Sequence, residues 1–155
     1  MKDMGPVIGR WPVLAAAVGA LGLMLVTPAT GARPGVTKVE ASLTAAQVVP
    51  KQDVAVPNAK GHFTASLFPA QGRIVWHLTL RGLSGRPTQV AVRYGRTGPG
   101  AILLELCPTA CASSGIEEQI FAGTFAAIKS GHANVTVYKA KNTGGEIRGS
   151  IHIVR

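Results

Sequence analysis

The sequence predicts an all-β domain, an antiparallel β-sandwich or Greek-key barrel, preceded by a separate apolar segment. Along most of the chain after residue 33, apolar and polar residues alternate, which is typical of strands with one buried and one solvated face. Glycine (19) and proline (10) interrupt this alternation at intervals of about eight to twelve residues, as turns do. Charged residues make up only 15% of the chain and aromatic residues 5%, a composition that disfavours a coiled coil or a helical bundle.

The N-terminal segment, residues 1–32, is predicted to be an export signal and not part of the domain. A basic start is followed by an uncharged apolar stretch from Val13 to Val26 and then by small residues up to Ala32. As a helix this stretch spans about 21 Å, which is shorter than the bilayer hydrocarbon core of about 30 Å. We therefore expect cleavage to leave residues 33–155, with an uncleaved membrane anchor over residues 11–32 as the alternative. Both hypotheses place the domain outside the cytoplasm.

The clearest predicted strand is Arg73 to Arg81 (RIVWHLTLR). Its large apolar residues share one face, while Arg73, His77 and Arg81 share the other. Several short strands, each with an apolar face, must bury those faces against one another, which favours a sandwich or a barrel. In chain order, the predicted strands are residues 36–49, 60–68, 73–81, 88–94, 101–106, 116–124, 133–139 and 146–154.

Turn residues explain where these strands end. Pro50 ends the first strand, and segments rich in glycine and proline at residues 82–87 and 95–100 separate later ones. A short helix is predicted only at residues 125–130, where the alternation is lost. The sequence therefore predicts one all-β domain with one short helical piece.

The two cysteines, Cys107 and Cys111, are predicted to form a structural disulfide. Three residues separate them, and outside the cytoplasm such a pair is oxidised by default. A redox pair usually has two intervening residues beside a helix start, and a zinc site needs two further ligands; the nearby sequence offers neither. Closing so short a loop stabilises the protein by about 2 kcal/mol, so the bridge fixes a loop and does not hold the fold together.

The chain is strongly basic, with 16 Lys and Arg against 7 Asp and Glu, a net charge of +9. No acidic residue lies between Asp53 and Glu105, a span that holds several arginines. A face of this kind attracts polyanions such as acidic polysaccharide or anionic lipid headgroups. The alternative is a solvated basic surface that only keeps an exported protein soluble. The candidate polyanion-binding face comprises Arg73, His77, Arg81, Arg93 and Arg96.

Arg93 joins this face only if strands 73–81 and 88–94 pair as a hairpin. The expected partners are anionic envelope polymers or another extracellular protein, with membrane contact only through an uncleaved N-terminal segment. Nucleic acid is disfavoured as a partner, because Trp76 and Tyr94 are predicted to point inward and base stacking needs exposed rings.

Two segments carry a family resemblance. Residues 43–50 (LTAAQVVP) resemble the opening of the chordin-type (CHRD) domain, and residues 135–151 (VTVYKAKNTGGEIRGSI) are similar to its closing stretch. The resemblance implies a small secreted bacterial protein with an immunoglobulin-like or superoxide-dismutase-like β-sandwich and no assigned activity. The positions that match the family motif, and that we expect to be structural, are Gln47, Pro50, Gly145, Glu146, Arg148 and Gly149.

The departures from the family pattern concern histidines. Relatives commonly carry a His-x-His pair on a middle strand and a further histidine near the end, where this chain has Val92, Tyr94 and Tyr138. A set of imidazoles on neighbouring strands can bind a transition metal. Because this chain lacks all three, we predict no metal and no cofactor.

In the closing hairpin, Gly144 and Gly145 are predicted to form the tight turn. Glu146 and Arg148 then fall on one face of the last strand, where they pair with each other or with a neighbouring strand. The opposite face carries the predicted core residues Ile147, Ile151 and Ile153.

No catalytic residue is predicted, because Glu146 has no second acid, histidine or nucleophile near it in the sequence. We therefore expect an exported, non-enzymatic module that binds or scaffolds at the cell envelope through its basic face. Two alternatives remain. One is a metal-dependent or redox enzyme of the dismutase-like type, which the missing histidines disfavour. The other is a small-ligand carrier, in which Tyr94 and Tyr138 line a pocket if they lie near each other.

Overall fold

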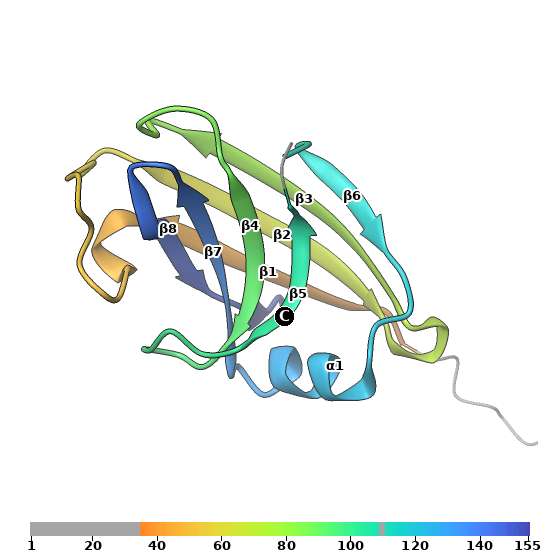
Figure 1. The fold of residues 1–155 in the computed structure, drawn as a ribbon. Helices are drawn as coiled ribbons and strands as arrows, with labels where there is room; N and C mark the ends of the chain where they lie inside the picture. Colours follow the sequence, from red (N-terminus) through yellow and green to blue (C-terminus); the bar gives the residue numbers. More distant parts are fainter. Residues whose placement is uncertain (1–34, 109–110) are drawn as a thin grey trace, which may run out of the picture. The chain divides into compact units, whose positions relative to one another are not determined.

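A computed structural model describes residues 35–108 and 111–155, and the predicted signal segment lies outside these residues. The described chain forms antiparallel strands that curl into a nearly closed barrel (Figure 1). Of the two architectures left open by the sequence, the structure is the barrel. The strands are β1 (Thr37–Thr44), β2 (Lys60–Phe68), β3 (Arg73–Arg81), β4 (Gln89–Tyr94), β5 (Ile102–Cys107), β6 (Ser114–Glu117), β7 (Ala133–Lys139), β8 (Asn142–Ser150) and β9 (His152–Ile153).

The strand order around the barrel is β5-β4-β7-β8-β1-β2-β3-β6, and β9 pairs with β1. The two outermost strands in this order, β5 and β6, are not paired with each other. Apolar side chains from the inward faces fill the interior, among them Phe63, Trp76 and Ile147. One helix, α1 (Ala122–Lys129), lies at one end of the barrel and buries Phe125 and Ile128 against the core.

The strands with the clearest alternation of apolar and polar residues are predicted correctly. β2, β3 and β7 have the predicted bounds, and along β3 the outward residues include Arg73, His77 and Arg81. β2 pairs with β3 in an uninterrupted register from Lys60 opposite Arg81 to Phe68 opposite Arg73. The outer faces of β1, β2 and β3 therefore form one continuous surface.

Two predicted strands are longer than the observed ones. The first ends at Thr44, and a short 3-10 turn, η1 (Ala45–Gln47), follows it in place of the predicted strand up to residue 49. The predicted strand 116–124 splits into β6 and the first turn of α1. The reason is the change from a period of two to a helical spacing, since Thr124, Phe125 and Ile128 fall on one buried side of α1.

The β7–β8 hairpin turns at residues 140–141, with Lys139 opposite Asn142, so the prediction of a turn at Gly144 and Gly145 is wrong. Both glycines lie within β8. Gly145 has a φ of +118° in the stretch where the register between β7 and β8 shifts, so a backbone bulge requires the glycine.

β8 ends at Ser150, and the chain then passes to β9 beside β1. Ile147 and Ile151 are buried as predicted. Ile153 is 42% exposed, so its predicted place in the core is wrong, because the change of strand partner at Ile151 breaks the alternation. Within residues 35–108 and 111–155, no helix has the length and apolar character needed to span a bilayer.

Candidate functional site

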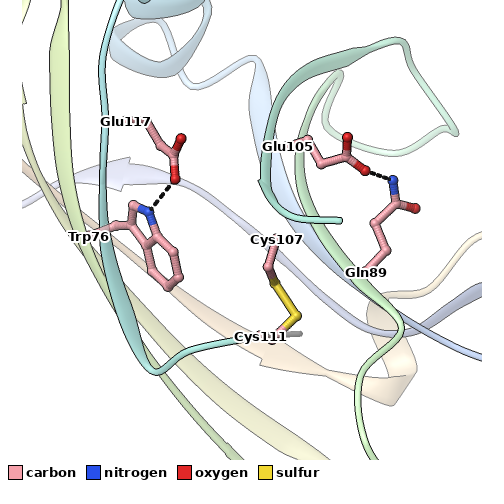
Figure 2. Close-up of a disulfide and its surroundings, with 6 residues drawn as sticks. All are labelled: Trp76, Gln89, Glu105, Cys107, Cys111 and Glu117. Carbon is pink, nitrogen blue, oxygen red and sulfur yellow. Dashed lines mark hydrogen bonds between the residues drawn. A yellow bond between two sulfur atoms is a disulfide. The ribbon is translucent and has the colours of Figure 1, made fainter. Parts of the chain in front are cut away.

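The two cysteines form the predicted disulfide, Cys107–Cys111. It lies in the connection between β5 and β6, the two outermost strands of the barrel order. Figure 2 shows the bridge between two hydrogen-bonded pairs: Trp76 Nε1 donates to Glu117 on β6 at 3.1 Å, and Gln89 donates to Glu105 on β5. The disulfide thus lies in the connection between the two ends of the sheet.

The predicted basic face divides into two groups. β3 pairs with β2 and β6, whereas β4 pairs with β5 and β7, so the hairpin that would place Arg93 beside β3 does not exist. Arg73, His77 and Arg81 share the outer face of β3. Arg93 lies on β4, and Arg96 lies in the following loop, where its Nε donates to the carbonyl of Gly131 at 3.0 Å.

A shallow groove lies on the outer face of β1, β2 and β3, and we call it the basic groove. At the end of these three strands, a row runs across them as Thr44, Lys60 and Arg81, each directly opposite the next. Hydroxyl groups border the two cations. The lining residues are Ser42, Leu43, Thr44, Lys60, Gly61, His62, Thr79 and Arg81.

The charges in the basic groove are poorly balanced. Lys60 and Arg81 are exposed and directly opposite each other, a placement of like charges that destabilises a strand pair. Among the described residues, no carboxylate lies within 4.0 Å of either cation. The nearby Glu40 carboxylate instead lies between two imidazoles, 3.6 Å from His62 Nε2 and 3.2 Å from His152 Nε2. The face therefore carries an excess of positive charge.

Lys60 is missing from the predicted face, although its phase in the alternation is that of His62 and the outward residues of β2. The alternation along β2 is therefore enough to place Lys60 on the outward face. Thr44 and Ser42 carry no comparable signal, because only the β1–β2 register places them next to the cations.

Glu146 lies in the middle of β8 and is fully buried. Its carboxylate accepts hydrogen bonds from the Ser84 backbone N–H (2.7 Å), the Ser84 hydroxyl (2.6 Å) and the Asn142 side chain (2.8 Å). Its backbone carbonyl accepts a hydrogen bond from Gln52. Glu146 therefore ties the 82–87 segment and the 50–56 segment to the hairpin, which is a structural role.

Lys139 supplies a positive charge near this buried carboxylate, although the two groups are not within 4.0 Å of each other. Its side chain is also buried, and within the described residues its Nζ has no hydrogen-bond acceptor. Burial lowers the pKa of Lys139, and the negative charge of Glu146 opposes this shift only in part. Burial by itself raises the pKa of Glu146, but the hydrogen bonds from Ser84 and Asn142 and the charge of Lys139 outweigh it, so the net pKa is lowered.

These two shifts predict that the free energy of unfolding rises with pH. Below about pH 4.3, the ordinary glutamate pKa, the unfolded chain takes up a proton before folded Glu146 does, so stability falls on acidification. Between the lowered pKa of Lys139 and its ordinary value, the unfolded chain holds the extra proton, so stability increases towards alkaline pH. Urea unfolding over a pH series measures both limbs. Glu146→Gln should reduce the change in the free energy of unfolding at acidic pH, and Lys139→Met should reduce the change at alkaline pH. An unchanged pH dependence in either variant would contradict the role given to that residue.

Arg148 does not pair with Glu146. Its guanidinium lies on the outer side of the β4–β7–β8 strands, where its Nη2 is 3.4 Å from the carbonyl of Gly95. Of the two predicted alternatives, pairing of Glu146 with Arg148 is not what forms: Glu146 bonds to Ser84 and Asn142, and Arg148 bonds to the Gly95 carbonyl.

The other motif positions serve the backbone. Gln47 Nε2 donates to the Ser42 carbonyl and the Thr44 hydroxyl, both at 3.2 Å, across the end of β1. Pro50 follows a cis peptide bond and lies against Gly144. A Cβ at Gly149 would meet the Ser42 carbonyl oxygen at 2.4 Å, so only glycine allows β8 to approach β1 this closely.

Val92, Tyr94 and Tyr138 do not come together. Val92 and Tyr94 occupy alternate positions of β4, whereas Tyr138 lies opposite Gln89 and so projects from the other face. Val92 is buried in the core, and Tyr94 is 51% exposed, so the prediction that Tyr94 points inward is wrong. Its position at the last residue of β4 frees it from the alternation. Tyr138 and Tyr94 line two different hollows.

No three His, Cys, Asp or Glu residues in the described part of the chain come close enough to hold a metal ion. The structure is thus a small antiparallel barrel whose closing hairpin carries a buried glutamate and a buried arginine. A family model for the CHRD domain matches residues 39–151, which is most of the chain. The protein therefore belongs to the CHRD domain family, as the two terminal motifs predict. Among curated proteins and among solved structures, no significant match was found.

Proposed function

We propose that the protein is an exported, non-enzymatic module that binds acidic polysaccharide of the cell envelope through the basic groove. One observation carries this proposal: Lys60 and Arg81 lie directly opposite each other on an exposed face, with no carboxylate beside them among the described residues. The repulsion between the two cations is relieved when an anionic group lies between them.

The groove also offers the polar groups that sugars need. Thr44, Thr79 and Ser42 place hydroxyl groups beside the cations, and hydroxyl groups both donate and accept hydrogen bonds. The lining contains no Phe, Tyr or Trp on which bases could stack. An acidic polysaccharide therefore fits the groove better than a single-stranded nucleic acid.

Export is part of the proposal. The Cys107–Cys111 disulfide is compatible with an oxidising location, since such bonds persist outside the cytoplasm and are rare within it. The apolar segment before residue 33 supports the same location. The net charge of +9 favours accumulation at an anionic envelope.

Charge reversal in the groove tests the proposal. We expect the double variant Lys60→Glu/Arg81→Glu to bind dextran sulfate at least tenfold more weakly than the wild type at low salt, because two attractive cations become repulsive. Its affinity should also fall less steeply with salt, since fewer counterions are released from the polymer. Fluorescence anisotropy with labelled polymer over a salt series measures both effects, with neutral dextran as the blank.

The matched control is Lys51→Glu/Lys141→Glu, which changes the net charge equally at two exposed lysines outside the groove. Equal losses for the two double variants would show a diffuse charge effect and refute the groove. Circular dichroism of both variants checks that folding is intact. Parallel titrations with double-stranded DNA and with anionic lipid vesicles show whether the polysaccharide is the preferred polyanion, and tighter binding to either one would overturn that choice.

A further inference from the structure

Two arginine side chains lie next to each other beneath loops on the outer side of β4, β7 and β8. Arg93 comes from β4, and Arg148 comes from β8, on either side of β7. Thr136 on β7 lies directly opposite Arg148, and Tyr138, two residues further on, contacts Arg93. We call these two arginines the guanidinium pair.

The hydrogen bonds of the guanidinium pair go only to neutral acceptors. Arg93 Nε donates to the carbonyl of Gly100 at 2.6 Å, and Arg93 Nη1 donates to the Tyr138 hydroxyl. Arg148 has one hydrogen bond, from Nη2 to the Gly95 carbonyl. In residues 35–108 and 111–155, no carboxylate oxygen lies within 4.0 Å of either guanidinium.

This arrangement is electrostatically incomplete. Only 3% of Arg148 is exposed, and a buried charge ordinarily has a counter-charge. Burial and the positive charge of Arg93 both lower the pKa of Arg148, although Tyr138 opposes them. An arginine nevertheless stays protonated at ordinary pH, so two positive charges remain side by side.

A small hollow opens onto both guanidinium groups. Its walls include Arg93, Arg148, Thr136 and Tyr138, together with Val48, Val49, Gly98, Pro99 and Gly144. Its cavity volume is only about 10 Å³, far below the range of about 300 to 1,000 Å³ of ordinary ligand pockets. The hollow therefore excludes a whole organic ligand, and a small group held by the two guanidinium groups would lie at its mouth, partly in solvent.

We propose that the guanidinium pair binds a single tetrahedral oxyanion, a sulfate or phosphate group. The two positive charges match a dianion, and each planar guanidinium can donate two parallel hydrogen bonds to such a group. The Gly95 and Gly100 carbonyls and the Tyr138 hydroxyl hold the two side chains in place before the anion arrives. The site is separate from the basic groove and does not depend on the function proposed for it.

Sulfate and phosphate titrations of the full-length protein test the proposal. We expect each anion to bind with a stoichiometry of one by isothermal titration calorimetry and to raise the thermal unfolding midpoint in a saturable way. Chloride at matched ionic strength should do neither. The absence of saturable binding beyond the chloride control would overturn the proposal.

Variants distinguish binding at the guanidinium pair from nonspecific binding to the positive charge of the protein. Arg93→Met should weaken sulfate binding at least tenfold, whereas Arg96→Met, at an exposed arginine of the adjacent loop, should leave it unchanged. Equal losses in both variants would overturn the proposal. Arg148→Met should abolish binding; because this residue is buried, Arg93→Lys, which keeps the charge but loses the planar fork, gives a second test and should also weaken binding.

The source of the oxyanion is settled by comparing inorganic phosphate with glycerol 1-phosphate. Binding of inorganic phosphate alone identifies a free ion, and binding of both identifies a site that also accepts the end group of a larger molecule. Lys60→Glu/Arg81→Glu should keep its phosphate affinity, so the outcomes for the guanidinium pair and for the basic groove are independent. Loss of phosphate binding in that double variant would refute the separation of the two sites.

Discussion

Replacing Glu146 with alanine should destabilise the protein by about 3 to 5 kcal/mol, a large fraction of the roughly 5 to 15 kcal/mol by which an ordinary domain is stable. The carboxylate is fully buried and accepts three hydrogen bonds from Ser84 and Asn142. Its loss leaves those donors without an acceptor and leaves Lys139 buried without a counter-charge. Urea denaturation, followed by tryptophan fluorescence from the buried Trp76, measures the effect.

Two further variants separate these causes. Glu118→Ala removes an exposed glutamate and should change the stability by less than about 0.5 kcal/mol. Lys139→Met in the Glu146→Ala background removes the uncompensated cation and should recover part of the loss, as coupled residues do in a double-mutant cycle. A Glu146→Ala protein as stable as the Glu118→Ala protein would show that the buried carboxylate does not hold the 82–87 segment.

Replacing Gly149 with valine should destabilise the protein at least as much, because the new side chain would clash with backbone atoms of β1. A Cβ at this position would lie 2.4 Å from the Ser42 carbonyl oxygen. β1 is paired with β2 and β8, and β8 is also paired with β7, so moving either strand would disturb these pairings. Overpacking usually costs about 1 to 3 kcal/mol when side chains can yield, and here the atom that must yield belongs to a strand. We expect little folded protein on expression, and a reduced unfolding midpoint for the milder Gly149→Ala.

The matched control is another glycine. Gly123 lies in α1, and nothing stands within 4 Å of the place that its Cβ would take. Gly123→Ala should therefore stabilise the protein by up to about 1 kcal/mol, because alanine is the better helix former. If Gly149→Ala and Gly123→Ala had the same midpoint, close contact between β8 and β1 would not be what requires Gly149.

The sequence predicts strands best where the two faces differ most. β3 alternates arginine, histidine and threonine with large apolar residues, so both its bounds and its outward face follow from the pattern. β7 (ANVTVYK) also alternates apolar and polar residues, which predicts its bounds, but every residue of β7 is buried, including the outward Asn134 and Thr136. Its outward residues lie beneath loops, which a pattern read along one strand cannot show.

The contacts of Arg93 and Glu146 depend on the strand order and on the positions of the loops, which the sequence pattern does not predict. Arg93 is predicted to join Arg73 and Arg81, but β4 pairs with β7, and this pairing brings Arg93 next to Arg148 instead. The partners of Glu146 are equally remote, since Ser84 lies 62 residues away in the chain. Such contacts depend on tertiary packing, and no local periodicity encodes them.

The nearly closed barrel leaves the free edges of β5 and β6 at one side, and this has a consequence for self-association. Unpaired strand edges are templates on which another chain can add a strand, the route to aggregation. Here the edges are short, and the connection between them carries the Cys107–Cys111 bridge. We expect reduction of the disulfide to release that connection and to make the edges of β5 and β6 more accessible, so the reduced protein should self-associate more readily than the oxidised protein.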